Sequence, residues 1–484
     1  MLLLFTAALP LIAGALLPCL RIRSRRARML YVLIVTCLTS ALCLYGVFAG
    51  QRALWAPDIE IPIADPLTLR WALDDAGRVY LGVAALLWPF AVLYAVDYMK
   101  HERREGRFFT WYTMTFGVAV LLACAANLFT LYVSYEFLTL LTVPLVWHEK
   151  DDESTRSARQ YMIYLFGGAA LGFVAMMGLY ALGAGAFHPG GEAGLTSPWL
   201  GPIALLGFVG FGAKAAVLPL SRWLPKASVA PTPVTALLHA VAVVNAGVFA
   251  VARLLYYVIP PSALRGGWAQ TAMLILSAAT VLYGSAMAVR EQHMKRRLAW
   301  STVSNLSYML FGLSLLSGEG LAAGLSHMVF HGMTKIILFF CAGSVMVQTG
   351  RTQVRSMHGL GKYMPLTFGA YALAGISLMG VPPMPGFVSK YALVTAAFSE
   401  GGLWPYAGAV ALLISAVLTA VYIFTVVFPA FFMKPALGEN ERPREGGACM
   451  RASLMLLCLI LLLGSVFAGN IMAFLSRMAE VIGG

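Results

Sequence analysis

The sequence predicts an all-α integral membrane protein with about 14 transmembrane helices, on the evidence of its composition, its hydropathy and the placement of its charges. Of the 484 residues, 60% are hydrophobic and 11% are charged, and the mean hydropathy is +0.79. A soluble domain has about 45–50% apolar and about 25% charged residues, so this composition excludes a soluble globular protein. We expect one polytopic membrane domain over residues 1–484, without a soluble domain or a nucleotide-binding motif.

Fourteen apolar runs follow one another along the chain, each with about the length that a transmembrane helix needs. In order, they cover residues 2–20, 29–48, 80–98, 109–126, 128–147, 159–182, 203–221, 233–258, 268–289, 298–316, 322–347, 366–398, 406–433 and 452–475. The run 366–398 is too long and too rich in proline for one plain helix. The loops between the runs are polar and mostly short.

The basic residues lie mainly in alternate loops. Of the 34 Lys and Arg residues, 25 lie in or next to the loops after odd-numbered runs, 6 in or next to the other loops and in the C-terminal tail, and 3 well inside apolar runs. Because cytoplasmic loops are rich in Lys and Arg, the odd loops are predicted in the cytoplasm and both termini outside it. We therefore expect a multi-pass protein of the cell inner (cytoplasmic) membrane, with an organellar membrane as the alternative. The net charge of +13 follows from this topology, so nucleic acid is excluded as a partner.

The seven cysteines form no CxxC pair, and most of them lie inside apolar runs. No disulfide framework, iron–sulfur site or zinc site can be read from their spacing. We expect no cofactor and no metal in this chain. No redox or hydrolytic centre is recognisable, so whether the chain is part of an enzyme stays open.

Four ionisable side chains lie inside apolar runs: Glu136, Lys214, Lys335 and Lys390. A charge at mid-membrane costs about 2.5–3.5 kcal/mol on insertion scales, so each requires a reason. One interpretation is that Glu136 pairs with a lysine only to hold helices together. Four such groups in one bundle, together with intramembrane histidines, favour an ion path instead.

Two of these lysines lie beside helix breakers. Lys214 lies between Gly212 and Pro219. The segment before Lys390 contains Pro382, Pro383, Pro385 and Gly386. Broken helices at membrane depth line protein-buried or watery cavities. The breaks fall in the seventh and twelfth runs, so residues 109–258 and 268–433 are predicted to be two inverted five-helix repeats around an ion path.

His327, His331 and Lys335 follow one another at i, i+4 and i+8 on one face of a predicted helix. Because His and Lys can each accept and release a proton, this ladder is a candidate proton relay. A metal site at the two histidines is disfavoured, since the acid of a zinc-protease helix is absent. His239 is either a further relay group or a hydrogen-bonded core histidine. Asn305 begins a glycosylation-like Asn-Leu-Ser sequence, but it lies within a predicted helix and is expected to be unmodified.

Four segments together resemble a known family. They are LYVSYEFLTLLTVPLVW, GFGAKAAVLPLSRWLPKASVAPTPVTALLHA, HMVFHGMTKIILFFCAGSVM and GVPPMPGFVSK. They look like the antiporter-like subunits of respiratory complex I, of Mrp-type multisubunit sodium/proton antiporters and of energy-converting membrane hydrogenases and formate hydrogenlyases. The resemblance covers the fourth to the thirteenth helix, and the whole chain fits the family's 14-helix core.

The resemblance implies a role for each matching residue. Glu136 would be the family's helix-5 glutamate, and Lys214 the helix-7 lysine with which it pairs. Lys390 would be the terminal helix-12 group, and His239 matches a helix-8 histidine of part of the family. Asn245 is a departure, because many members carry a helix-8 lysine there and an asparagine cannot hold a charge.

Lys335, with His327 and His331, would form the central relay of helix 11. Either His239 and water then bridge Lys214 and Lys335, or the relay is interrupted at Asn245.

The resemblance implies a proton-translocating subunit of a redox-driven, hetero-oligomeric complex. Flavin, iron–sulfur or nickel–iron centres would then belong to partner subunits, including a peripheral redox module. One alternative is a subunit of a redox-free Mrp-type sodium/proton antiporter, and another is a structural membrane subunit with an inactive ion path. Sodium prefers oxygen ligands, so a row made mostly of Lys and His favours protons.

Overall fold

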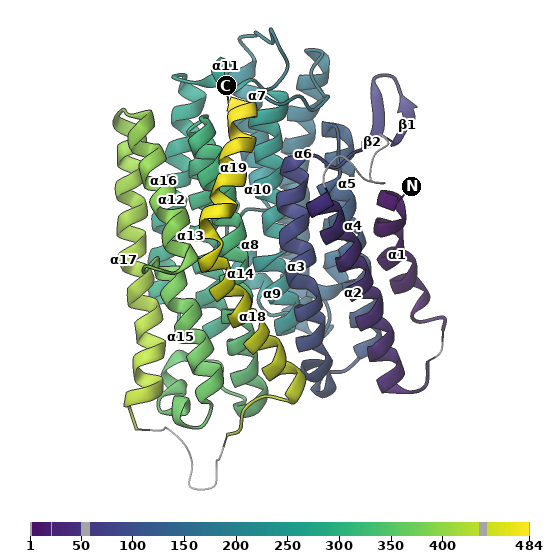
Figure 1. Ribbon diagram of the computed structural model, residues 1–484, viewed down its shortest axis with the longest axis vertical. Coiled ribbons are helices and arrows are strands. Elements are labelled where there is room, and N and C mark those ends of the chain that lie inside the picture. The colour runs from purple at the N-terminus through teal and green to yellow at the C-terminus, as the bar shows by residue number, and fades with distance from the viewer. Residues whose placement is uncertain (1, 21, 50–58, 435–442, 484) are drawn as a thin grey trace.

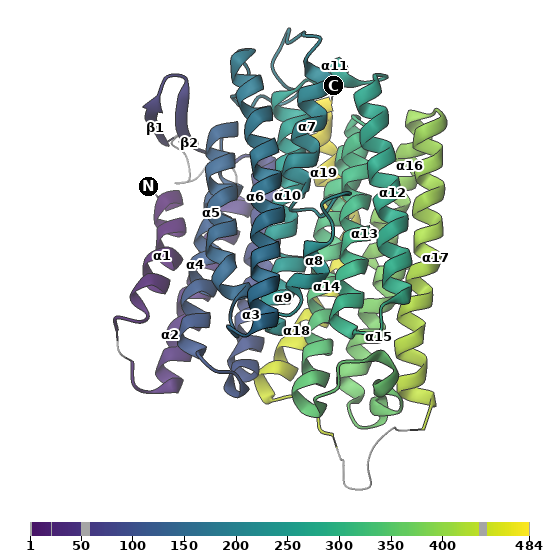
Figure 2. The ribbon, with the colours of Figure 1, turned by 180° about the vertical axis from the view of Figure 1, so that it is seen from behind.

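The computed structural model describes residues 2–20, 22–49, 59–434 and 443–483, and it is mostly α-helical (Figure 1). The long helices run side by side in one bundle, as the view from behind also shows (Figure 2). An antiparallel hairpin of β1 (Ile59–Ala64) and β2 (Leu67–Trp71) lies at one end of the bundle.

Within the described residues, nine helical segments are long and apolar enough to cross a membrane, judged by length and composition. They are α2 (Arg25–Ala49), α3 (Asp75–Tyr98), α5 (Leu128–Val146), α6 (Asp152–Ala181), the segment Thr232–Val258, α12 (Trp268–Arg290), α14 (Gly318–Thr349), α17 (Leu403–Phe432) and α18 (Ala448–Val466). The segment Thr232–Val258 consists of α9 (Thr232–Ala240), α10 (Val243–Arg253) and the π-helical turn η3 (Leu254–Val258). These segments confirm the prediction of a helical integral membrane protein.

The remaining helices complete the bundle and its loops. Three are apolar but shorter: α1 (Leu2–Leu16), α7 (Leu200–Gly212) and α15 (Pro365–Met379). The others are α4 (Glu105–Ala123), α8 (Trp223–Ala227), α11 (Pro261–Leu264), α13 (Met294–Ser314), α16 (Pro385–Glu400), α19 (Ala468–Gly483) and the 3-10 turns η2 (Met99–His101), η4 (Val354–Met357) and η5 (Leu360–Lys362). The number of crossings and the inverted repeats stay predictions.

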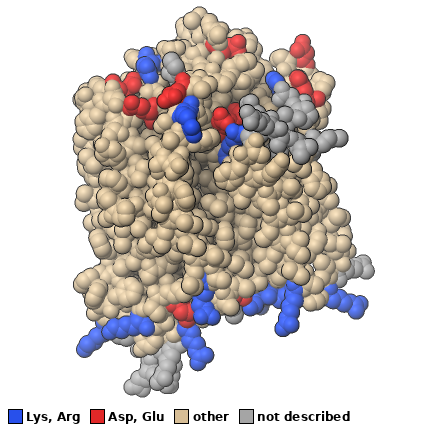
Figure 3. All heavy atoms as spheres, viewed as in Figure 1, with Lys and Arg blue, Asp and Glu red and all other residues tan. Residues whose placement is uncertain are grey.

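Charged side chains on the visible face gather at the two ends of the bundle, with an uncharged band between them (Figure 3). Lys and Arg predominate at the lower end in this view, and most of the visible Asp and Glu lie at the upper end. Large apolar side chains are exposed along the band, for example Val417 and Phe424 on α17. Apolar surface of this kind is suited to lipid tails, so the band marks the part of the bundle that the membrane covers.

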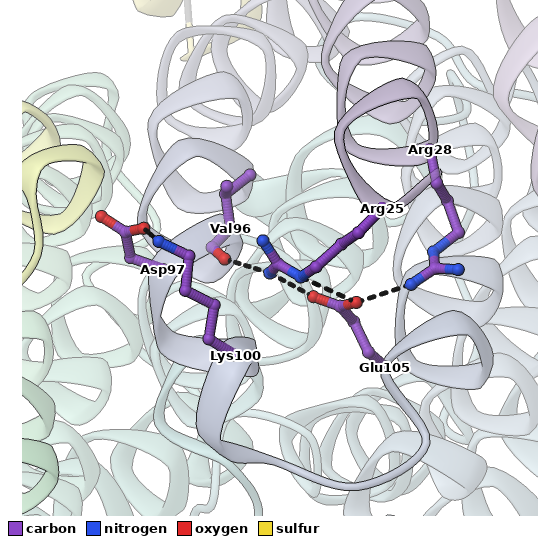
Figure 4. Close-up of polar contacts among 6 residues, drawn as sticks. All are labelled: Arg25, Arg28, Val96, Asp97, Lys100 and Glu105. Atoms are coloured by element: carbon purple, nitrogen blue, oxygen red, sulfur yellow. Dashed lines mark hydrogen bonds and ion pairs between the residues drawn. The ribbon is translucent and has the colours of Figure 1, made fainter. Parts of the chain in front are cut away.

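Ion pairs join the helix ends at the basic end of the bundle (Figure 4). Arg25 and Arg28 of α2 both pair with Glu105 in the first turn of α4, the Arg28 contact at 2.7 Å. Arg25 also donates to the Val96 carbonyl oxygen of α3 at 2.6 Å. A carboxylate in the first turn is favourable because of the helix dipole, so Glu105 stabilises α4, and Arg25 joins α2 to both α3 and α4.

Asp97 connects α3 to the last part of the chain. Its carboxylate pairs with Lys100 (Figure 4) and accepts a hydrogen bond of 2.6 Å from the Cys449 amide at the start of α18. A carboxylate at a helix N-terminus satisfies a free amide and complements the dipole. Asp97 therefore caps α18 and fixes it beside α3.

The centre of the bundle is formed by α14, which is buried from Gly320 to Val345, and by the segment Thr232–Val258, which is buried throughout. Around α14 pack α3, α9, α13, α15, α16, α18 and α19. These two central elements carry five of the predicted functional residues, so they lie where the surrounding protein excludes lipid.

Two helix breaks lie where the sequence predicts them. The helix α7 ends at Gly212, and Lys214 follows in an irregular segment that includes Pro219. The helix α15 ends at Met379, and α16 begins at Pro385 after Pro382 and Pro383. Proline has no amide hydrogen to continue a helix, as at Pro219, Pro382 and Pro383. Gly380, directly after α15, adopts the left-handed conformation that ends this helix.

A third break, at Val241 and Ala242 between α9 and α10, has no glycine or proline to predict it. Asn245 donates from Nδ2 to the Ala240 carbonyl oxygen at 3.0 Å, and this bond satisfies a group that the break leaves free. Asn245 is therefore part of the break itself, a role that the sequence analysis did not foresee.

Gly386 in the first turn of α16 provides a test of the α15–α16 packing. A Cβ atom at this position would lie 1.9 Å from the Ser377 carbonyl oxygen of α15. We expect Gly386→Ala to lower the free energy of unfolding by about 1–3 kcal/mol through overpacking, measured by thermal unfolding in detergent. The matched control is Gly369→Ala in α15, where a Cβ atom meets nothing within 4 Å. Equal stability of the two variants would contradict this packing.

Candidate functional site

Three lysines and three histidines expected to carry protons are all buried inside the bundle: Lys214, His239, His327, His331, Lys335 and Lys390. They come from the irregular segment after α7, from α9, from α14 and from α16. Glu136 on α5 is half-buried. The structure thus places every predicted ionisable group within the bundle.

At one end of this row, Lys214 lies against α5. Its ammonium donates to the Tyr135 carbonyl oxygen and lies 3.4 Å from the centroid of the Tyr135 ring. Tyr135 in turn donates from its hydroxyl to the Phe211 carbonyl oxygen at 2.9 Å, which fixes the end of α7. The direct Glu136–Lys214 ion pair that the resemblance implies is not formed between these two described residues. The backbone oxygen and the ring take its place because Tyr135, not Glu136, points toward α7.

The helix α10 connects Lys214 with the α9–α10 break. Gly247 lies so close to the Lys214 segment that a Cβ atom on it would be 2.5 Å from the Ala215 nitrogen. Two residues earlier, Asn245 contacts Ala240 at the break. On the other side of the break, a Cβ atom on Gly332 of α14 would be 2.8 Å from the Ala240 oxygen. The break therefore lies between Lys214 and the α14 residues.

His239 and His331 lie on the two sides of this junction. His239 is the residue before Ala240, and His331 is the residue before Gly332. Neither imidazole has a hydrogen-bond partner on either ring nitrogen, although both are buried. The Asn245 Oδ1 atom and the Glu136 Oε1 atom are likewise buried without a partner. Buried polar atoms are almost always satisfied by protein or by ordered water, so these atoms mark positions where water would join the row.

Lys335 is held by α13. Its ammonium donates to the Leu298 carbonyl oxygen at 2.9 Å and to the Ser301 hydroxyl. Lys390 is held by the end of α15, where it donates to the Leu378 and Met379 carbonyl oxygens at 2.7 and 3.2 Å. The free carbonyl groups of a helix C-terminus carry partial negative charge, so the α15–α16 break supplies a cation site for Lys390.

His327 connects three helices. Its Nε2 lies 3.2 Å from the Asn305 Oδ1 atom of α13, and its Nδ1 lies 2.9 Å from the Ser389 hydroxyl of α16. Its ring stacks on Tyr308 with a centroid distance of 5.3 Å, and the Lys390 ammonium lies 5.2 Å from the same Tyr308 ring. The His331 ring is 6.0 Å from the His327 ring. His327 is therefore the meeting point of the α14 ladder and the Lys390 site.

The sequence analysis missed four residues that hold these groups: Ser301, Asn305, Tyr308 and Ser389. The signal was present, because the predicted run 298–316 contains the segment Ser-Thr-Val-Ser-Asn-Leu-Ser-Tyr. So many hydroxyl and amide groups in one membrane helix indicate a polar face that meets polar partners.

In the part of the chain that the structure describes, no three His, Cys, Asp or Glu side chains converge as metal ligands. His327 is occupied by Asn305 and Ser389, which are the partners of a relay or core histidine. The geometry thus gives His327 a hydrogen-bonding role between α13 and α16, whereas the ring nitrogens of His331 have no partner among the described residues.

Glu102, in the loop between η2 and α4, titrates in the physiological range. Burial and the neighbouring Glu149 carboxylate raise its pKa to about 7, against a smaller opposing effect of Lys295. A carboxyl group whose pKa is raised on folding contributes stability at low pH and loses that contribution as pH rises from about 4.5 to about 7. We expect Glu102→Gln to become progressively more stable than the natural chain across this range, measured as the difference in thermal midpoint. A difference that does not change with pH would contradict the assignment.

A protein-family model described as "NADH:quinone oxidoreductase/Mrp antiporter, TM" matches residues 125–419. This range contains every residue of the row from Glu136 to Lys390. It covers more than half of the chain, and it confirms the resemblance that the four sequence segments indicated.

Three relatives are similar in sequence. NADH-quinone oxidoreductase subunit L of Mycobacterium tuberculosis (strain H37Rv) is 33% identical over 390 residues, which are 79% of this chain and 59% of the relative. Subunit N of the same type of enzyme from Desulforudis audaxviator is 33% identical over 428 residues, covering 84% of this chain and 82% of the relative. F(420)H(2) dehydrogenase subunit L of Methanosarcina mazei is 30% identical over 445 residues, which are 84% of this chain and 65% of the relative. The chain thus matches less than two thirds of the length of either subunit L.

Three solved structures share the fold. One is the archaeal membrane-bound sulfane sulfur reductase, with a TM-score of 0.83, 23% identity and coverage of 99% of this chain and 96% of that chain. For the Mrp complex from Dietzia sp. DQ12-45-1b, the TM-score is 0.82 and the identity 21%, with coverage of 99% of this chain and 97% of that chain. For respiratory complex I from Thermus thermophilus, the TM-score is 0.84 and the identity 23%, with coverage of 100% of both chains. The family model covers the whole row of buried groups, and subunit N of Desulforudis audaxviator is 33% identical over 84% of this chain. The chain belongs to the NADH:quinone oxidoreductase/Mrp antiporter transmembrane family.

Proposed function

We propose that this chain is a proton-translocating membrane subunit of a multisubunit, redox-driven ion pump. One observation carries the proposal: three lysines are buried inside an apolar bundle, and none of them forms an ion pair with a described acidic side chain. Their ammonium groups are held by backbone oxygens, a hydroxyl and aromatic rings. A lysine can both hold and release a proton, so a row of lysines that no ion pair fixes in the charged state is suited to passing protons.

In the proposed mechanism, protons move along Glu136, Lys214, His239, Lys335 and Lys390, with His327 and His331 as supporting groups. Glu136 is adjacent in sequence to Tyr135, which holds Lys214, so a small movement of α5 would change the charge that Lys214 experiences. When Glu136 approaches, the ammonium is favoured, and when it withdraws, the proton is released. Moving one charge across 100 mV requires about 2.3 kcal/mol, which lies within the range of such charge–charge effects.

The proposal includes the finer topology. The chain would cross the membrane 14 times, with inverted repeats at residues 109–258 and 268–433. The helix breaks after Gly212 and before Pro385 would lie at matching places of the two repeats. The basic end of the bundle would face the cytoplasm of the cell inner membrane, and both termini would lie outside the cytoplasm. The distribution of charge in Figure 3 supports this orientation.

The relatives support membrane partners, because their names describe subunits of larger enzymes. We propose that this chain binds no cofactor, and that flavin, iron–sulfur or nickel–iron centres belong to partner subunits. A second candidate is a subunit of an Mrp-type sodium/proton antiporter, favoured by the similarity in fold to the Mrp complex from Dietzia. The same buried row would serve either complex.

The experiment that separates these candidates is gentle purification of the tagged chain from native membranes, followed by mass spectrometry of the proteins that remain bound. We expect subunits with flavin, iron–sulfur or nickel–iron centres, as a redox-driven pump requires. Small membrane subunits without any redox protein would contradict the redox-driven pump and support the antiporter. In that event sodium dependence of proton flux becomes the next measurement.

A further inference from the structure

Asn305 and Ser389 contact the two ring nitrogens of His327, and all three side chains are buried. They come from α13, α16 and α14, which pack against one another. In Figures 1 and 2 these helices lie in the same half of the bundle. The geometry of these contacts determines which nitrogen of His327 can exchange a proton.

The orientation of the Asn305 amide is fixed from the other side. Its Nδ2 donates to the Ser301 carbonyl oxygen at 2.7 Å. A reversed amide would place two oxygen atoms against each other at that distance, and two acceptors repel. The Oδ1 atom therefore faces His327 Nε2, at 3.2 Å. An amide oxygen only accepts hydrogen bonds, so Nε2 must carry a hydrogen atom in both the neutral and the charged ring.

The nitrogen that titrates is then Nδ1, and its neighbour is suited to both states. In the neutral ring, Nδ1 is an acceptor and the Ser389 hydroxyl donates to it at 2.9 Å. In the charged ring, Nδ1–H donates to the Ser389 oxygen, and the hydroxyl hydrogen turns to the Gly386 carbonyl oxygen, which lies 3.3 Å away. Ser389 can therefore satisfy His327 before and after protonation.

We propose that Asn305 is a positioning residue that holds His327 as the Nε2–H tautomer and directs its proton exchange through Nδ1 toward Ser389 and Lys390. This inference rests on the proposed function for its consequence in transport, but the tautomer itself does not. His327 then exchanges protons with the α16 side of the row. His331 has no hydrogen-bond partner on either nitrogen, and the next residue, Gly332, lies against Ala240 at the α9–α10 break.

The first measurement is the tautomer of His327 in the full chain. Nitrogen-15 chemical shifts of labelled histidine in membranes distinguish the two tautomers, and the difference from His327→Gln assigns the signals among the eight histidines. We expect Nε2–H in the natural chain and a change toward Nδ1–H in Asn305→Leu. The matched control is Ser307→Ala, which removes a buried hydroxyl without a partner from the same helix and should leave the tautomer unchanged.

An Nδ1–H tautomer in the natural chain would overturn the inference, and this result does not depend on whether Asn305→Leu folds. An unchanged tautomer in folded Asn305→Leu would overturn it as well. In the native complex, proton flux of Asn305→Leu should fall by about threefold to tenfold, the effect of losing one neutral hydrogen bond, with an altered pH profile. A complex without any proton flux but with Nε2–H at His327 would refute the proposed function and leave the tautomer assignment intact.

Discussion

Lys214→Ala is expected to lower proton translocation by about 100-fold or more, the loss that follows removal of a group that donates and accepts a proton. Lys214 is buried beside Tyr135 at the α5 end of the row, and no other described lysine contacts Tyr135 to take over its role. The measurement is pH-sensitive dye uptake by vesicles that contain the native complex.

The control is Lys226→Ala in α8, which removes an exposed lysine only twelve residues further along the chain. Both variants should assemble, because the contacts of the Lys214 ammonium among the described residues are with the backbone oxygen and the ring of Tyr135. Natural proton flux in an assembled Lys214→Ala complex would refute the proposed path. An inactive natural complex would support a structural subunit with an inactive ion path.

The second large effect is expected at Asp74, which pairs with the fully buried guanidinium of Arg253 at the end of α10. Arg253 also lies 4.4 to 5.0 Å from the ring centroids of Phe187, Phe249 and Tyr257. Removing one partner of a fully buried pair leaves an uncompensated charge and costs about 3–5 kcal/mol. Arg253 is fully buried, but the Asp74 side chain is 39% exposed, so water screens part of this effect. We expect Asp74→Asn to lower the free energy of unfolding by about 2–3 kcal/mol, measured by denaturation in detergent.

Asp74→Asn is the informative substitution because Asp74 also caps α3 by accepting from the Gly77 amide at 2.9 Å. An asparagine side-chain oxygen can still accept that bond, so the substitution removes the negative charge while the helix cap is kept. The matched control is Asp75→Asn, which breaks an exposed pair with Arg78 and should cost about 1 kcal/mol or less. An equal decrease in the free energy of unfolding in the two variants would show that the Asp74–Arg253 pair stabilises the protein no more than the exposed pair does.

The helical membrane class and the ionisable row could be predicted from the sequence because each rests on a local property. An apolar run of about 20 residues can only be stable in a membrane as a helix. A charge inside such a run is costly enough to stand out from its neighbours. The breaks after Gly212 and before Pro385 were predictable for the same reason, since glycine and proline act on their own backbone.

Other features had no local signal. The break between α9 and α10 contains only valine and alanine, and it is stabilised by Asn245 from the next helix. The expected Glu136–Lys214 pair is replaced by a contact with Tyr135, one residue earlier in the same helix. A rotation of about 100° between consecutive helical residues decides this, and no apolar pattern fixes the rotation of a helix that is apolar on all sides.

The sequence by itself thus determined that the protein is a helical membrane protein of this family and which ionisable groups lie inside its apolar segments. Only the tertiary structure decided that α14 and the segment Thr232–Val258 are central and that Asn305 and Ser389 hold His327. The reason is physical: lipid tails are as apolar as the protein interior, so composition shows that a helix is in the membrane but not which neighbours surround it. Contacts between residues far apart in the chain, such as His327 with Ser389, arise only when the helices pack.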